Sequence, residues 1–177
     1  MSLPAWAQRL PLDIIQKEAN ERGLDWRLIA ALCRQESSGN QWAQRYEPNA
    51  TRSINQNFWK YASLNGITPQ TESIAECTSF GLLQVMGYVA RSLGFDGPLT
   101  RLCDPETGVH YGCLLLCQLF KRFTELDAVV SSYNQGSPRK GIDGKYLNYK
   151  NYVLPVLGYM AELSADNSPP SPGNLAA

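Results

Sequence analysis

The chain has 177 residues, enough for one domain with a complete hydrophobic core. Hydrophobic residues make up 44% and charged residues 18%, which is typical of a globular protein and not of a disordered one. Basic and acidic residues number 16 each, so the chain lacks the basic excess that nucleic-acid binding favours. No apolar run approaches the roughly 20 residues that a membrane span needs. We therefore expect neither nucleic acid nor membrane as a partner.

The first residues contain no basic segment followed by an apolar one, so they do not resemble a secretory signal peptide. The sequence thus predicts synthesis in a cytoplasm, where thiols stay reduced. The chain has five cysteines, no Cys-x-x-Cys pair and a single histidine, His110. We expect free thiols that serve as small core residues, and neither a metal nor a cofactor.

Two helices are predicted in the first forty residues. The first covers 12–21, with its apolar residues on one face, and Gly23 ends it. Asp25 is the expected N-cap of a second, apolar helix that ends near 37–39.

The middle of the chain has no sustained hydrophobic period. Residues 42–77 are rich in polar and aromatic side chains, and we interpret them as an irregular insert with a short helical piece near 56–64. A helix from about Leu82 to Leu93, capped by Ser79, is predicted to follow.

The second half of the chain predicts a mainly α-helical domain. Asp104 followed by Pro105 is a strong start signal, an N-cap and then proline at the first helical position. Further helices are expected over 104–123, 126–133 and 149–163. Residues 165–177 are rich in proline and serine and predict a flexible tail, so the domain is expected to span 1–164.

Glu36 is the candidate for acid chemistry, because it stands at the end of the apolar second helix. Burial against apolar side chains raises the pKa of a carboxyl group, and the negative end of the helix dipole acts in the same direction. Both effects favour the neutral carboxylic acid that a general acid requires near pH 7. The alternative is a solvent-exposed glutamate on the last helical turn.

Three short motifs follow one another along the chain, and the first of them contains Glu36. They are Glu36-Ser37, Gly81-Leu82-Leu83-Gln84 and Tyr133-Asn134. In this order they resemble the three signatures of the lytic transglycosylases of the soluble (SLT) type, and Asn151-Tyr152-Val153 resembles the closing segment of that family. The resemblance covers about residues 24–163 and implies a lysozyme-like, mainly α-helical domain.

The resemblance implies an enzyme that cleaves the β-1,4 bond between N-acetylmuramic acid and N-acetylglucosamine in peptidoglycan. Glu36 matches the single acid/base of the family, which protonates the glycosidic oxygen and then deprotonates the muramic C6 hydroxyl to close a 1,6-anhydro ring. The N-acetyl group of the substrate stabilises the reacting carbon, so the family needs no second carboxylate, whereas hydrolases usually use a pair.

The resemblance also implies which side chains line the sugar-binding groove. They are Gln84, Met86, Tyr133, Asn134 and Tyr152. Tyr133 is expected to orient the acid or the N-acetyl group, and Tyr152 is expected to hydrogen-bond to Glu36.

The interval between Glu36 and the second motif is longer than is typical of the family, because residues 42–77 lie between them. We expect this insert to cover the groove and to stack aromatic rings on sugars. Those aromatic residues are Trp42, Tyr46, Phe58 and Trp59. The insert also contains Glu47 and Glu76. Either would make a lysozyme-type hydrolase possible, and Glu76, just before the second motif, is the favoured one.

A non-catalytic glycan-binding module on the same fold is the remaining alternative. If no signal peptide carries the enzyme to the wall, a phage lysis enzyme, a virion enzyme or a secretion-system accessory would fit, and we favour a phage enzyme. The partner expected is the peptidoglycan glycan strand, and a monomer is sufficient for such an activity.

Overall fold

The structure is a computed structural model that describes residues 3–53 and 57–165. Its first two helices begin and end where the local sequence signals predict. Helix α1 (Leu12–Arg22) ends at Gly23, which has a φ of 65°. Asp25 caps α2 (Trp26–Ser37), since its carboxylate accepts a hydrogen bond of 2.9 Å from the backbone N–H of Arg27. Both predictions are confirmed.

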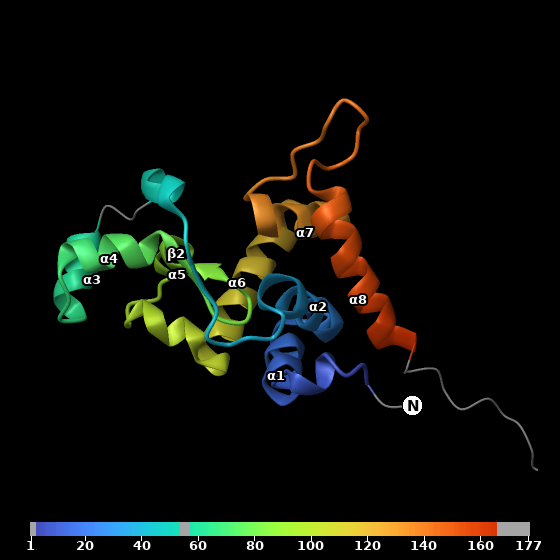
Figure 1. Cartoon of the computed structure of the whole chain (residues 1–177), viewed down its shortest axis with the longest axis horizontal. Helices are drawn as coiled ribbons and strands as arrows, with labels where there is room; N and C mark the ends of the chain where they lie inside the picture. The colour runs from blue at the N-terminus through green and yellow to red at the C-terminus, as the bar shows by residue number, and fades with distance from the viewer. Residues whose placement is uncertain (1–2, 54–56, 166–177) are drawn as a thin grey trace, which may run out of the picture.

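The insert is more regular than predicted. It contains strand β1 (Gln44–Tyr46), a 3-10 helix η2 (Pro48–Ser53) and helices α3 (Phe58–Leu64) and α4 (Pro69–Glu76). Helix α3 confirms the short helical piece expected near 56–64. The helices α3 and α4 pack on each other and lie at one end of the molecule (Figure 1).

The helix predicted from Leu82 to Leu93 is wrong in its first half. Strand β2 (Thr78–Phe80) turns back into β3 (Val85–Met86), and only then does α5 (Gly87–Ser92) begin. The three strands form an antiparallel sheet in the order β1-β2-β3, in which Phe80 pairs with Val85. The turn between β2 and β3 requires left-handed backbone at Gly81 and Gln84, and such a conformation cannot continue a helix.

The remaining elements include the three helices predicted in the second half of the chain, with shifted ends, and two 3-10 helices and a π-helical turn that were not predicted. They are the 3-10 helices η1 (Ala7–Arg9) and η3 (Leu99–Cys103), α6 (Pro105–Arg122), α7 (Leu126–Gln135), the π-helical turn η4 (Tyr149–Val153) and α8 (Leu154–Ala165). Asp104 caps α6 as expected, accepting a 3.0 Å hydrogen bond from Thr107 N–H. From residue 166 onward, the predicted tail lies outside the described residues.

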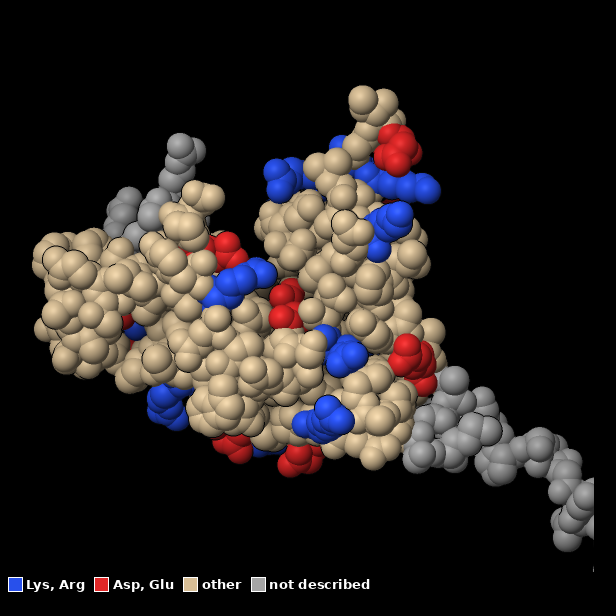
Figure 2. Space-filling model, in the orientation of Figure 1, with Lys and Arg blue, Asp and Glu red and all other residues tan. Residues whose placement is uncertain are grey.

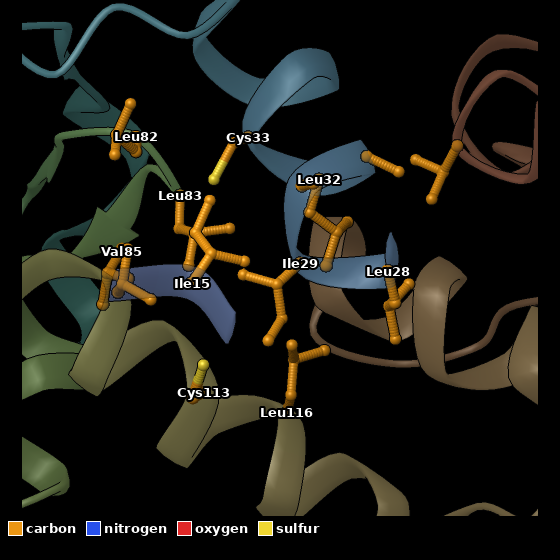
Figure 3. Close-up of a cluster of buried hydrophobic side chains, with 14 of the residues drawn as sticks. Ile15, Leu28, Ile29, Leu32, Cys33, Leu82, Leu83, Val85, Cys113 and Leu116 are labelled. Carbon is orange, nitrogen blue, oxygen red and sulfur yellow. The ribbon is translucent and has the colours of Figure 1, made fainter. Parts of the chain in front are cut away.

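Helix α2 runs through the hydrophobic core, and its six residues Leu28–Cys33 are all buried. Figure 3 shows Ile29 of this helix between Leu83, from the turn before β3, and Leu116, from α6. Helix α8 packs along α2 on one side, and α1 packs against both α2 and α6. The core therefore surrounds α2, the helix that carries Glu36 in its last turn.

The five cysteines are free thiols, as predicted, and four of them are buried. Burial raises the pKa of the Cys113 thiol to about 12, so this group is an unreactive core side chain at neutral pH. Within residues 3–53 and 57–165, no helix combines the length and apolar character that crossing a membrane requires.

Candidate active site

A groove of about 670 Å³ lies between the β-sheet with α5 on one side and the C-terminal half of α7 on the other. Figure 2 shows a hollow on this face of the molecule, between the half that carries α3–α5 and the half that carries α7 and α8, with acidic and basic side chains along it. Four of the sugar-binding residues predicted from the sequence, together with the candidate acid, line the groove: Glu36, Gln84, Met86, Tyr133 and Asn134.

Glu36 lies at the C-terminal end of α2, where the chain turns sharply away. Ser38 takes left-handed backbone with a φ of 55°, and Gly39 N–H bonds back to Cys33 O at 3.2 Å. Burial raises the pKa of the Glu36 carboxyl above its ordinary value, while the hydrogen bond from Tyr152 and the charge of Arg45 act in the opposite direction. The carboxyl is therefore in an environment that favours the neutral acid.

Tyr152 lies in η4, just before α8, and is 6% exposed. Its hydroxyl donates a hydrogen bond to Glu36 Oε1, as the resemblance implied. It is not among the groove-lining residues, so it supports Glu36 from behind. A neutral hydroxyl that donates a hydrogen bond stabilises the carboxylate that forms when Glu36 gives up its proton.

Ser37 connects the end of α2 to the turn between β2 and β3. Its hydroxyl lies 2.9 Å from Leu82 O and 3.0 Å from Cys33 O. At the same turn, a Cβ on Gly81 would lie 2.2 Å from Leu102 O, so only glycine fits. The contact between Ser37 and Leu82 and the close approach at Gly81 thus hold the second motif beside Glu36.

Gln84 lines the groove, but its amide is largely engaged within the protein. Its Nε2 donates to Ala43 O at 3.0 Å and to Gly81 O at 2.9 Å, and its Oε1 accepts from Ser79 Oγ at 2.9 Å. These bonds hold Gln84 in left-handed backbone with a φ of 46°. These contacts of Gln84 hold together the β2–turn–β3 segment that forms this wall of the groove.

The third motif forms the opposite wall. Tyr133 donates its hydroxyl proton to Leu83 O at 2.9 Å, which links α7 to the second motif. Burial raises the pKa of Tyr133 well above its ordinary value, so it stays a neutral donor. Asn134 is exposed at the groove and accepts a 3.0 Å hydrogen bond from Asn148 Nδ2.

The two candidate second carboxylates lie in different places. Glu76 is fully buried at the end of α4, beside the start of α5, and is not among the groove-lining residues. A Cβ on Gly87 would lie 2.7 Å from Glu76 Cα, which shows how closely these helices meet. The preference for Glu76 was therefore wrong, because it rested on closeness in sequence. Glu47 does line the groove, and its Oε1 lies 2.5 Å from Arg45 Nε.

The aromatic residues of the insert are not among the groove-lining residues either. Trp42 and Trp59 are exposed, and the Phe58 and Trp59 rings contact each other at 5.1 Å. The expected stacking platform is thus absent from the described groove. Tyr88 of α5 is the aromatic residue that the sequence analysis missed there. Its position two residues after Met86 was the available signal.

Ser132 and Gln135 also line the groove and were missed. They flank Tyr133-Asn134 in the sequence, and α7 extends two residues beyond the predicted 126–133, which brings Gln135 onto the same helix face as Ser132. The groove thus contains Glu36 in an environment that favours the neutral acid, with Tyr152 supporting it from behind and polar side chains on the walls, which suits the cleavage of a sugar chain.

Comparison with known proteins agrees with this chemistry. The family model for the Transglycosylase SLT domain matches residues 13–152, most of the chain. The search of curated proteins found no match, and neither did the search of solved structures. The predicted fold class, a mainly α-helical lysozyme-like domain, is confirmed, and the family acts on peptidoglycan of the bacterial cell wall. The chain belongs to the transglycosylase SLT domain family of peptidoglycan-degrading enzymes.

Proposed function

We propose that the protein is a lytic transglycosylase that cleaves the β-1,4 bond between N-acetylmuramic acid and N-acetylglucosamine and leaves a 1,6-anhydro-muramic end. The observation that carries the proposal is the placement of Glu36 in the groove, where burial raises its pKa and Tyr152 supports it. Membership of the SLT family supplies the substrate class.

In the first step of the proposed reaction, the neutral carboxyl of Glu36 gives its proton to the glycosidic oxygen while the bond from that oxygen to muramic C1 breaks. The carbonyl oxygen of the muramic N-acetyl group stabilises C1. Tyr152 then stabilises the Glu36 carboxylate through its hydrogen bond. The N-acetylglucosamine part leaves with a free hydroxyl.

In the second step, the Glu36 carboxylate takes the proton of the muramic C6 hydroxyl. The C6 oxygen bonds to C1 and releases the N-acetyl oxygen, which closes the anhydro ring. Glu36 ends protonated, so the enzyme is ready for another turnover and no water is consumed. We propose that Gln84, Met86, Tyr133 and Asn134 hold the sugars during both steps.

A lysozyme-type hydrolase remains the second candidate, because Glu47 lines the same groove as Glu36. In that mechanism Glu47 would activate a water molecule for attack on C1. The Oε1 atom of Glu47 is already engaged in an ion pair with Arg45 Nε. We therefore favour the route that needs Glu36 alone.

Digestion of purified peptidoglycan followed by mass spectrometry of the muropeptides tests the proposal. We expect products lighter by one water than the hydrolytic ones, and no cleavage by Glu36→Gln. A Glu47→Gln variant should still make anhydro products. Hydrated ends that disappear in Glu47→Gln would establish the hydrolase, and intact sacculi would indicate a glycan-binding module. The phage setting remains a prediction from the sequence.

A further inference from the structure

The α7 wall of the groove carries two buried polar atoms that the proposed mechanism does not use. Ser132 is 1% exposed and lines the groove, and its Oγ has no hydrogen-bond partner in the described part of the chain. The Oε1 atom of Gln135 is also buried, lines the same groove and lacks a partner among the described residues.

The neighbouring Ser131 shows what an internally satisfied serine on this helix looks like. Its hydroxyl donates to Asn148 Oδ1 at 2.8 Å, and Asn148 Nδ2 donates back to Ser131 O at 3.2 Å. Ser131 is not among the groove-lining residues. Two adjacent serines of α7 therefore differ: the hydroxyl of Ser131 is bonded within the fold, whereas Ser132 lines the groove and its hydroxyl has no partner among the described residues.

Ser132 and Gln135 are three residues apart, so their side chains share one face of α7. Buried polar atoms are almost always hydrogen-bonded, because desolvation without a partner is costly. A molecule in the groove is the natural source of those partners. The pair offers it one hydroxyl donor and one carbonyl acceptor on neighbouring positions.

We propose that Ser132 and Gln135 bind the acetamido group of one sugar of the glycan strand. The Ser132 hydroxyl donates to the acetamido carbonyl oxygen, and Gln135 Oε1 accepts from the acetamido N–H. The pair thereby selects N-acetylated over de-N-acetylated glycan. This inference deepens the proposed function and rests on a glycan lying in this groove.

The charges of the groove-lining side chains also favour the N-acetylated sugar. In mildly acidic buffer a de-N-acetylated sugar carries an ammonium group, which has donors but no acceptor. It cannot accept the Ser132 proton. It would also lie in a groove whose charged lining residues are three arginines and two glutamates, so basic side chains outnumber acidic ones: Arg45, Arg122, Arg139, Glu36 and Glu47. Discrimination then comes from a lost hydrogen bond and from repulsion between like charges.

Binding in the Glu36→Gln background tests the inference without turnover. Isothermal titration would compare chitotetraose with its fully de-N-acetylated counterpart. We expect tighter binding of chitotetraose. Ser132→Ala and Gln135→Met should each weaken chitotetraose binding about 3- to 10-fold, the effect of one hydrogen bond, and leave binding of the de-N-acetylated tetramer nearly unchanged.

Ser131→Ala is the matched control. It removes a hydroxyl one residue away that is bonded inside the fold, so it should lower the melting temperature and leave the preference for acetylated sugar intact. Ser132→Ala should leave the melting temperature unchanged or raise it, because it removes a buried hydroxyl without a protein partner.

Equal preference for the acetylated tetramer in the Ser132→Ala/Gln135→Met double variant and in its parent would overturn the inference, as would failure of the parent to bind chitotetraose. The proposed function is judged separately, by the mass of the peptidoglycan product. Anhydro product with unchanged acetyl preference refutes only the acetamido site, and hydrated product with a lost preference refutes only the transglycosylase mechanism.

Discussion

The two sides of the groove are stabilised in different ways. Helix α2, which carries Glu36, is surrounded by apolar side chains of α1, α6 and α8, and Figure 3 shows Ile15, Ile29 and Leu116 meeting there. The lobe of α3, α4 and α5 instead has an ion pair at its centre. Arg91 Nε donates to Glu72 Oε1 at 2.7 Å, and both side chains are fully buried.

Arg91 also links that lobe to the following loop. Its Nη1 donates to Phe95 O at 2.7 Å and to Gly97 O at 2.8 Å, and its guanidinium stacks over the Tyr61 ring at 4.4 Å. The contacts of Arg91 therefore hold the lobe together, whereas apolar packing around α2 holds the other half together. The apolar half thus provides the burial that raises the pKa of Glu36, and the polar lobe positions the facing wall of the groove.

The largest expected effect is a loss of activity on substitution of Glu36, at the end of the apolar helix α2. Glu36→Gln keeps the shape of the side chain and its acceptor for Tyr152 but removes the exchangeable proton. We expect a loss of peptidoglycan-clearing rate of about 100- to 10,000-fold, the usual contribution of a general acid, with an unchanged circular dichroism spectrum. Clearing at the wild-type rate would rule out Glu36 as the acid.

The next largest effect is expected in the lobe. Glu72→Gln leaves the buried Arg91 without its anionic partner, which should lower the free energy of unfolding by about 3–5 kcal/mol in urea titrations. Glu21→Gln is the control, because the Glu21 side chain is half exposed and its contact with Arg22 is long, 3.5 Å; its cost should stay below about 1 kcal/mol. Equal losses in the two variants would contradict a polar centre for the lobe.

Tyr152→Phe should have an intermediate effect on activity. The Tyr152 hydroxyl lowers the pKa of Glu36, so its removal should move the alkaline limb of the kcat/KM profile to higher pH. It should also reduce kcat/KM about tenfold, because the carboxylate formed in the first step loses a charge-assisted hydrogen bond. An alkaline limb that stays in place would show that Tyr152 does not act on Glu36.

The smallest effect concerns stability against pH. Burial raises the pKa of folded Glu36, so the unfolded chain ionises first as pH rises, and this group makes folding less favourable above the ordinary glutamate range. Glu36→Gln removes that penalty. Its melting temperature should equal that of the wild type near pH 4 and exceed it by a small margin at pH 7. A lower melting temperature at pH 7 would contradict a raised pKa.

Much of the fold followed from local signals in the sequence. Gly23, Asp25 and Asp104 mark helix boundaries through their own backbone or side-chain chemistry, so no distant contact is needed to predict them. The segment from Leu82 to Met86 was mispredicted, because apolar residues in a buried strand and turn read like an apolar helix. The segment instead turns back so that β3 pairs with β2, while β2 pairs with β1 and Gln84 Nε2 donates to Ala43 O; the last two contacts depend on partners far away in the chain.

The sequence by itself determined the helix order, the family resemblance and the candidate acid Glu36, because caps, hydrophobic period and ordered motifs act over a few residues. Only the tertiary structure decided which side chains share the groove. It placed Glu47 in the groove and buried Glu76, left the insert's tryptophans outside, and put Ser132 on the α7 wall. The physical reason is that burial and the facing of side chains arise when helices pack, and packing brings together residues that no local spacing connects.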